Sequence, residues 1–242
     1  SHEGRFDLAS GENFNRLYAD LAPRAAGILE PRVRSGANVS VAEARAALLQ
    51  ACAELPVTTE LQCLRRTLLG LAIDADVVLD LHCDNEAVLH LYTLPALWPE
   101  VEPLARLTGS RAALVADVSG DEPFDEACSA VWQRLCTALA ERTGRRIEWP
   151  AACVAVTIEL RGERDVAHEF ARPDAEAILQ YLAWRGFIAG APSSLPELTC
   201  EVTPLAGSMP VLAPHGGVLV HTRPLGSVVQ RGDVVAEIVD PL

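Results

Sequence analysis

The feature that most constrains the fold is an alternation of short apolar runs with longer segments of helical spacing. Residues 75–81 form a β-branched apolar run typical of a buried parallel strand, and residues 151–160 carry the strongest strand pattern in the chain. Helical spacing of apolar residues marks 41–55, 58–71, 126–141 and 173–186. Strands that alternate with helices predict an α/β domain with a mainly parallel sheet flanked by helices.

Local signals refine these elements. Ser40 is the expected N-cap of the first helix, and the second begins near Thr58 or Thr59. Pro173 suits the first turn of its helix, and Gly186 suits the position after the last turn. Residues 88–93 and 112–118 are expected to be further strands, and residues 1–36 a loop with a short helix.

The pattern changes near residue 190. A turn-like stretch, 189–194, precedes short β-type runs at 198–203, 217–221 and 234–239 that are separated by Gly and Pro. The sequence therefore predicts two domains. Residues 1–190 form the α/β domain, and residues 191–242 form a small β-barrel-like C-terminal domain.

Charge and composition exclude several functions. The net charge of −13 argues against a nucleic-acid partner, which requires clustered cations. All 20 basic residues are Arg, so a Schiff-base, P-loop, lipoyl- or biotinyl-lysine is excluded. No apolar run approaches the roughly 20 residues that span a bilayer, so no membrane partner is expected.

The cysteines and the chain start add two expectations. The 7 Cys are an odd number and contain no C-x-x-C pair, which is typical of reduced thiols in a cytoplasmic protein. The only Met is Met209, and the chain opens at Ser1. We therefore expect that an N-terminal part of the natural protein precedes this sequence.

A histidine flanked by carboxylates follows the predicted strand at 75–81. Asp80-Leu81-His82 and the acidic residues after it lie where α/β sheets place their sites, outside the carboxyl ends of strands. A neutral His82 imidazole can ligate zinc, and a nearby Asp can fix its tautomer. The alternative is a solvated or structural loop histidine.

Glu159 lies near the end of the strand predicted at 151–160, where a buried strand would carry an apolar residue. A carboxylate there costs free energy unless it is paired or functional. Beside a zinc-bound water, Glu159 can act as general base and then as general acid. The alternative is an ion pair with Arg161 or Arg164.

The opening loop supplies fork-shaped donors. Arg5, Asn15 and Arg16 suit a substrate carboxylate. The alternative is a polar surface loop without a ligand.

In this order, the three segments resemble the succinylglutamate desuccinylase/aspartoacylase family, which has a zinc carboxypeptidase-like fold. The resemblance implies that Asn15, Arg16 and Arg5 bind substrate, that His82 is the third zinc ligand and that Glu159 is catalytic. The C-terminal runs around 225–241 are similar to the β-domain of these enzymes. The resemblance also implies one Zn²⁺ per chain in the complete protein and a homodimer.

One departure from the family concerns the metal. The family's first two zinc ligands form an H-x-x-E pair upstream of the Asn-Arg pair, and this sequence contains none. His2 and Glu3 are adjacent and cannot replace it. The chain as given therefore lacks two of the three expected ligands, and zinc can be absent from it.

The resemblance implies a zinc-dependent amidohydrolase that cleaves the linear amide of a small N-acyl amino acid. Two alternatives are a zinc carboxypeptidase that acts on peptides and a metal-free binding module of the same fold. The sequence leaves open which acyl group and which amine are recognised.

Overall fold

The structure is a computed structural model that describes residues 4–190 and 194–241. Its elements, in chain order, are α1 (Ala22–Arg34), α2 (Val41–Ala53), α3 (Glu60–Ile73), β1 (Val77–Asp84), β2 (His90–Thr93), η1 (Pro95–Leu97), α4 (Trp98–Thr108), β3 (Ala112–Val115), α5 (Phe124–Thr143), β4 (Val154–Gly162), α6 (His168–Trp184), β5 (Val202–Pro204), η2 (Leu205–Gly207), β6 (Val218–His221) and β7 (Ala236–Val239).

The described residues fall into two compact units, which we treat separately. Unit 1 lies within Ser1–Asp80, Tyr92–Val101 and Ala116–Thr157. Unit 2 lies within Leu81–Leu91, Glu102–Val115 and Ile158–Leu242. The boundaries after Asp80 and after Thr157 fall inside β1 and β4, so each of these strands contributes residues to both units.

The main sheet has five strands in the order β1-β4-β2-β3-β5. It is mainly parallel, and helices flank it, so the predicted α/β class is confirmed. β5 pairs parallel with β3, with Ala113 opposite Val202. The predicted buried strand at 75–81 corresponds to β1, but β1 is at an edge of the described sheet; its residues 77–79 are half-buried and Leu81 is exposed.

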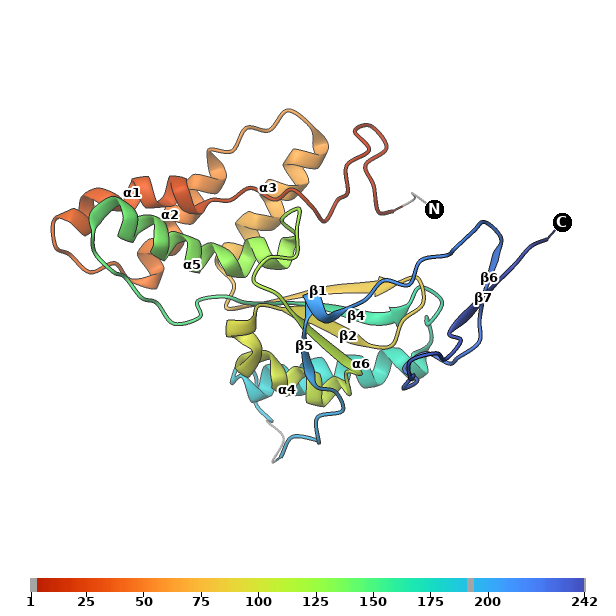
Figure 1. The fold of residues 1–242 in the computed structure, drawn as a ribbon. Coiled ribbons are helices and arrows are strands. Elements are labelled where there is room, and N and C mark those ends of the chain that lie inside the picture. The colour runs from red at the N-terminus through yellow and green to blue at the C-terminus, as the bar shows by residue number, and fades with distance from the viewer. Residues whose placement is uncertain (1–3, 191–193, 242) are drawn as a thin grey trace. The chain divides into compact units, whose positions relative to one another are not determined.

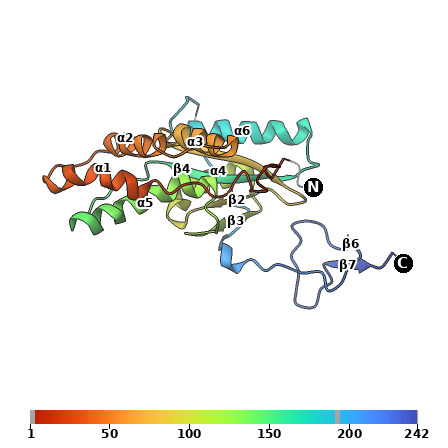
Figure 2. The ribbon, with the colours of Figure 1, turned by 90° about the horizontal axis from the view of Figure 1, so that it is seen from above.

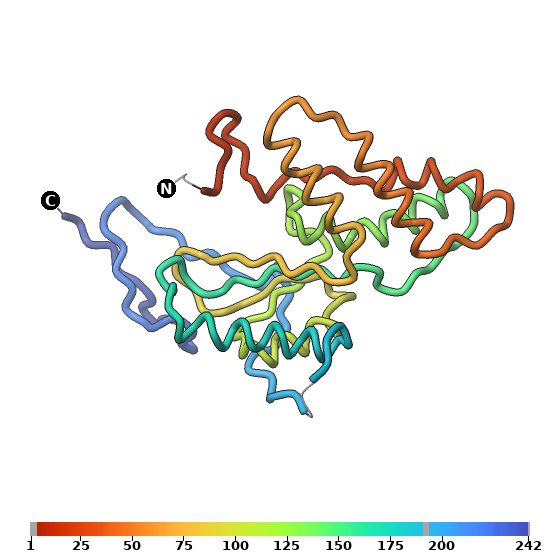
Figure 3. Tube along the Cα trace, turned by 180° about the vertical axis from the view of Figure 1, so that it is seen from behind, coloured from red at the N-terminus to blue at the C-terminus, as the bar shows by residue number. Residues whose placement is uncertain are grey.

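Unit 1 is built around four helices. α1 packs against α2 and α5, and α3 packs against the same two (Figures 1 and 3). Small residues such as Ala25, Ala44 and Ala51 are fully buried between them, so the helices approach closely. Leu48 and Leu139 fill the remaining space and are also fully buried.

The predicted start of α2 is confirmed in atomic detail. The Ser40 hydroxyl accepts a hydrogen bond from the Glu43 N–H at 3.2 Å, and the Glu43 carboxylate accepts one from the Ser40 N–H at 2.9 Å. This reciprocal pair is a capping box, which satisfies two N–H groups that the helix leaves open. The cap at Thr59 before α3 is confirmed as well.

Two helices in the middle and later part of the chain differ from the sequence predictions. α6 begins at His168, so Pro173 lies inside the helix rather than in its first turn. The Ala167 carbonyl already accepts hydrogen bonds from Phe170 and Ala171, and these start the helix upstream of the proline. α4 was not predicted, because Pro103 lies inside it and interrupts the helical pattern.

The C-terminal part of unit 2 ends in a small antiparallel sheet. β6 pairs with β7, with Leu219 opposite Ile238, and a long connection joins the two strands (Figure 2). Nearly every side chain from residue 205 onward is exposed. The expected domain boundary at residue 190 stays a prediction, because part of the predicted linker, residues 191–193, lies outside the described residues.

Candidate functional site

The predicted metal ligand and the predicted base lie on neighbouring strands. His82 is half-buried on β1, and Glu159 is half-buried on β4, with its Oε2 atom buried. The Val154 N–H donates to the Asp76 carbonyl at 2.9 Å, and the Glu163 N–H donates to the Asp84 carbonyl at 2.7 Å. β1 and β4 are therefore parallel, and both candidate residues belong to their carboxyl-terminal halves. Sites of open α/β sheets lie at this end of the strands.

The turn after Glu159 is tightly built. Arg161 has a φ of 69°, which is rare for a residue with a side chain. Its guanidinium pairs with Asp174 and lies 4.8 Å from the centre of the Phe170 ring. Arg161, one of the two partners considered for Glu159, thus ties the strand end to α6.

Gly162 permits a close approach of two loops in unit 2. A Cβ atom at this residue would lie 3.0 Å from the Asn85 carbonyl oxygen, so any side chain would push the loop after β1 away. The Gly162 N–H donates to the Asp165 carboxylate at 2.9 Å. The loops that follow β1 and β4 are therefore in contact.

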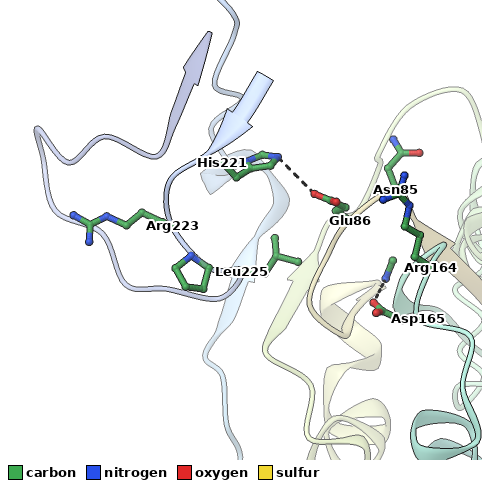
Figure 4. Close-up of a pocket in the computed structure, with 9 residues that line it drawn as sticks. Asn85, Glu86, Arg164, Asp165, His221, Arg223 and Leu225 are labelled. Carbon is green, nitrogen blue, oxygen red and sulfur yellow. Dashed lines mark hydrogen bonds and ion pairs between the residues drawn. The ribbon is translucent and has the colours of Figure 1, made fainter. Parts of the chain in front are cut away.

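A cavity of about 320 Å³ opens beside these loops, within unit 2. It is lined by Asn85, Glu86, Gly162, Arg164, Asp165, His221, Arg223, Pro224 and Leu225. His221 points toward Glu86, and their side chains form an ion pair at 3.7 Å (Figure 4). Arg223 points away from Glu86 in this view. The cavity combines cationic, anionic and apolar groups.

The predicted substrate-binding residues belong to unit 1. Arg5 is exposed, 6.0 Å from the centre of the Phe6 ring. Arg16 is half-buried, and its guanidinium donates to the Asn15 carbonyl at 2.6 Å. Arg65 holds the loop in place by donating to the Glu12 carboxylate at 2.7 Å and to the Asn13 carbonyl at 2.9 Å.

The Asn15 side chain is engaged on both sides of its amide. Its Nδ2 donates to Asp80 at 3.3 Å, and its Oδ1 accepts from the Phe124 N–H at 2.9 Å. These hydrogen bonds join the opening loop to β1 and to the first turn of α5. Asn15 therefore has a structural role in unit 1 alongside the role predicted for it.

A buried acidic group in unit 1 was not predicted from the sequence. Asp125 and Glu126 lie in the first turn of α5 and are 7% and 5% exposed. Burial, reinforced by the charges of Asp80 and Glu126, raises the pKa of Asp125 to about 6. Burial and then Asp80 also raise the pKa of Tyr18 to about 12. The sequence signal was weak, because acidic residues in a first helical turn are common on exposed helices.

The described residues do not complete a zinc site. Structural and catalytic zinc sites use at least three protein ligands. Among residues 4–190 and 194–241, no group of three His, Cys, Asp or Glu side chains could hold a metal ion. His82 is thus a single candidate ligand, and His2 and Glu3 lie outside the described residues.

The thiols and the helices add two observations. All seven cysteines are free. Cys83, next to His82, is exposed, whereas burial raises the pKa of the Cys128 and Cys153 thiols well above the ordinary range.

None of the helices in the described part of the chain combines the length and apolar character needed to cross a bilayer.

Comparisons with known proteins agree on the fold. A family protein of the succinylglutamate desuccinylase/aspartoacylase type from Shewanella amazonensis SB2B matches with a TM-score of 0.80 and 27% identity, over 98% of this chain and 64% of its own. A second, from Shewanella frigidimarina NCIMB 400, matches with a TM-score of 0.79 and 25% identity, over 98% and 63%. One from Rhodobacter sphaeroides matches with a TM-score of 0.61 and 19% identity, over 98% and 58%.

The chain thus spans less than two thirds of the length of these structural relatives. No protein-family model and no curated protein matches the sequence. The structural neighbours nevertheless bear out the resemblance read from residues 5–16, 80–82 and 157–159. In its fold, the chain is therefore similar to solved structures of the succinylglutamate desuccinylase/aspartoacylase family.

Proposed function

We propose that the chain is part of an amide hydrolase that removes the acyl group from a small N-acyl amino acid. The proposal rests on the positions of His82 and Glu159. Both side chains are half-buried, and both residues lie toward the carboxyl ends of the neighbouring parallel strands β1 and β4. The structural relatives are named for the cleavage of acyl groups from amino acids.

The proposed chemistry assigns Glu159 the proton transfers. Its carboxylate takes a proton from the attacking water, whose oxygen then bonds to the amide carbonyl carbon. When the C–N bond breaks, the same proton passes to the amine nitrogen. The products are a free carboxylate and a free amine.

We propose that His82 is one ligand of a zinc ion in the complete protein. Zinc, when bound, would polarise the carbonyl and acidify the water. His82 and the resemblance to the family support this part of the proposal, and no group of three potential ligands occurs among the described residues. Arg16, Asn15 and Arg5 are proposed to orient the substrate carboxylate. A cytoplasmic location and a homodimer also stay proposals.

The test is a pair of glutamate variants in the full-length protein. Glu159→Gln removes the base and keeps the side-chain shape, and it should lower kcat by at least about 10³-fold without loss of bound zinc. Glu141→Gln changes an exposed glutamate of α5 and should leave kcat unchanged. A Glu159→Gln enzyme that kept most of its activity would show that the base is another residue.

A substrate panel separates the proposal from its rivals. N-acetyl and N-succinyl amino acids should be cleaved faster than short peptides, whereas a carboxypeptidase would reverse this order. Zinc analysis of the full-length protein should find about one equivalent per chain. A protein without metal and without turnover under zinc-replete conditions would instead be a binding module.

A further inference from the structure

The opening loop of unit 1, residues 5–16, is a short hairpin that carries the three predicted substrate-binding residues (red in Figure 1). Phe6 and Asn13 form an antiparallel bridge between its two arms. Beside this bridge, the Phe14 N–H donates to the Arg5 carbonyl at 3.1 Å. Arg5 therefore lies on the first arm, and the other two predicted residues directly follow the second arm.

A buried arginine of α3, also in unit 1, holds the second arm of this hairpin. The Arg65 guanidinium donates to the Glu12 carboxylate at 2.7 Å and to the Asn13 carbonyl oxygen at 2.9 Å. The Asn13 Oδ1 atom in turn accepts a hydrogen bond from the Asn15 N–H at 2.9 Å. Arg65 is therefore linked through one intermediate residue to a predicted substrate-binding residue, and through the bridge at Asn13 to the arm that carries another.

Arg65 occupies a position of α3 where the helical pattern favours an apolar residue. Leu61 and Leu69, four residues before and after it, are 5% and 2% exposed, and Arg65 itself is 8% exposed. Its Nε atom is buried and has no hydrogen-bond partner among the residues that the structure describes. A buried guanidinium with an unpaired donor costs free energy that a leucine would not. The contacts with the opening loop account for an arginine at this position.

The chain after Arg16 is fixed by a separate set of contacts. The Leu17 N–H donates to the Asp121 carbonyl at 2.7 Å, and the Tyr18 N–H donates to the Glu122 carbonyl at 3.2 Å. Both acceptors belong to the loop before α5, in unit 1. The predicted substrate-binding pair thus lies between two anchors, which are these backbone hydrogen bonds and the guanidinium of α3. A single substitution in α3 would release one anchor and leave the other intact.

We propose that Arg65 is a positioning residue for the binding of the substrate carboxylate. It holds the second arm of the hairpin through Glu12 and Asn13, and it thereby keeps the three predicted substrate-binding residues in one arrangement. Arg65 does not itself touch the substrate. The inference rests on the proposed function, because it assigns Arg65 to the support of the proposed carboxylate site.

The main test is Arg65→Met in the full-length protein. This substitution removes both hydrogen bonds to the loop and keeps an apolar side chain of similar length between Leu61 and Leu69. It should raise KM for an N-acyl amino acid by about tenfold and change kcat by less than about threefold, because the carboxylate is bound in the ground state and the transition state alike. An unchanged KM in Arg65→Met would overturn the proposal.

The matched control is Arg66→Met, which changes the next residue of the same helix. The Arg66 side chain is half-buried, and its guanidinium donates to the Leu55 carbonyl at 3.4 Å, outside the opening loop. This variant should keep both KM and kcat. A similar rise of KM in the two variants would show that a general weakening of α3, and not the contact with the loop, is responsible.

A substrate without the carboxylate supplies a second test. The unsubstituted protein should cleave an N-acyl amino acid with a lower KM than the corresponding carboxamide. Arg65→Met should reduce this preference by about tenfold, because the variant raises KM for the carboxylate and leaves KM for the carboxamide nearly unchanged. A purely structural defect would raise KM for both substrates alike and would contradict the positioning role.

Glu12 offers a variant that leaves the buried face of α3 intact. Its side chain is 42% exposed, and Glu12→Ala removes one of the two acceptors of Arg65. KM should rise by about threefold in this variant and by no more than about tenfold in the double variant with Arg65→Met, because both changes release the same anchor. Effects on KM that multiply in the double variant would contradict the link.

Hydrogen exchange measured by mass spectrometry separates this inference from the proposed function. The backbone N–H groups of residues 5–16 should exchange at least about tenfold faster in Arg65→Met than in Arg66→Met, whereas those of α3 should not differ. If the unsubstituted protein cleaves no N-acyl amino acid but exchange responds in this way, the proposed function fails and the link between Arg65 and the loop holds. If the protein is active and neither KM nor exchange responds, the link fails alone.

Discussion

The four-helix layer of unit 1 and the C-terminal segment of unit 2, residues 205–241, are stabilised very differently. In the helical layer, Leu48, Leu139 and a series of alanines are fully buried, and caps close the helix starts. In the C-terminal segment, Leu219 is 54% exposed and Val228 is 89% exposed. An isolated two-stranded sheet is marginal in water. Burial therefore defines the first region, and local turns with a few surface contacts define the second.

The largest expected difference concerns apolar side chains. Leu139→Ala leaves a cavity in the helical layer and should lower the free energy of unfolding by about 3 kcal/mol. Leu219→Ala in β6 removes atoms that are already half in water, and the expected loss is below about 0.5 kcal/mol. Urea unfolding of the full-length protein, followed by far-UV circular dichroism, measures both. Similar losses in the two variants would mean that the C-terminal segment is covered in solution.

The same contrast explains which elements were predictable from the sequence. The caps at Ser40 and Thr59, and the apolar spacing of α2, α3 and α5, depend on local chemistry, and the structure confirms them. α4 was missed because Pro103 interrupts its pattern, and α6 starts before the expected Pro173. In both helices, contacts distant in sequence outweigh the local effect of proline; Arg161, for example, holds the first turns of α6.

The sequence indicated two candidate site residues on strands, but it did not indicate the buried Asp125. His82 was chosen because a histidine flanked by carboxylates follows an apolar run, and Glu159 because a carboxylate interrupts one; the roles of both residues stay predictions. Asp125 agrees with its local pattern, since an acidic residue in a first helical turn is ordinary. Only its burial, which raises its pKa, makes it unusual.

The second prediction uses Asp125 to test how completely the helical layer excludes water. Its pKa of about 6 lies above the ordinary value of 3.8, so its contribution to stability is fully present below pH 3.8 and is lost as the pH rises through 6. Asp125→Asn has no such loss. Between pH 4.5 and 7.5, the variant should gain about 2 kcal/mol of unfolding free energy relative to the unsubstituted protein.

The control for this pH effect is Glu141→Gln, which changes an exposed glutamate of the same helix. Its unfolding free energy should follow that of the unsubstituted protein at both pH values. Parallel curves for Asp125→Asn as well would mean that water reaches Asp125 and that the first turn of α5 is looser than the structure indicates.

The third prediction compares two serines. Ser40→Ala removes one half of the capping box of α2 and should cost about 1 kcal/mol. Ser227→Ala, in the exposed loop between β6 and β7, removes a hydroxyl that donates to the Pro224 carbonyl at 2.7 Å. That change should cost no more than a few tenths of a kcal/mol, because water replaces the exposed hydrogen bond. Urea titrations of both variants under one set of conditions test the ranking.

The smallest expected effect is the coupling free energy of the Glu86–His221 ion pair, which we compare with that of the Glu12–Arg65 ion pair. Glu86 and His221 join the loop after β1 to β6 at 3.7 Å, and both side chains are more than half exposed. Glu12 and Arg65, in unit 1, lie at 2.7 Å, and the Arg65 side chain is only 10% exposed. Solvent and salt weaken the first pair, so a double-mutant cycle with Glu86→Gln and His221→Gln should give a coupling below about 0.5 kcal/mol.

The matching cycle with Glu12→Gln and Arg65→Met should give a coupling of at least about 1 kcal/mol, because the arginine is largely removed from water and also donates to the Asn13 carbonyl. A coupling at Glu86–His221 as large as that at Glu12–Arg65 would mean that β6 is fixed firmly against the loop after β1. The cavity beside them would then be a rigid pocket. The expected weak coupling instead leaves the C-terminal segment able to move relative to that loop. Charged contacts would then differ between unit 1 and this segment in the same way as apolar contacts do: buried and strong in the first, exposed and weak in the second.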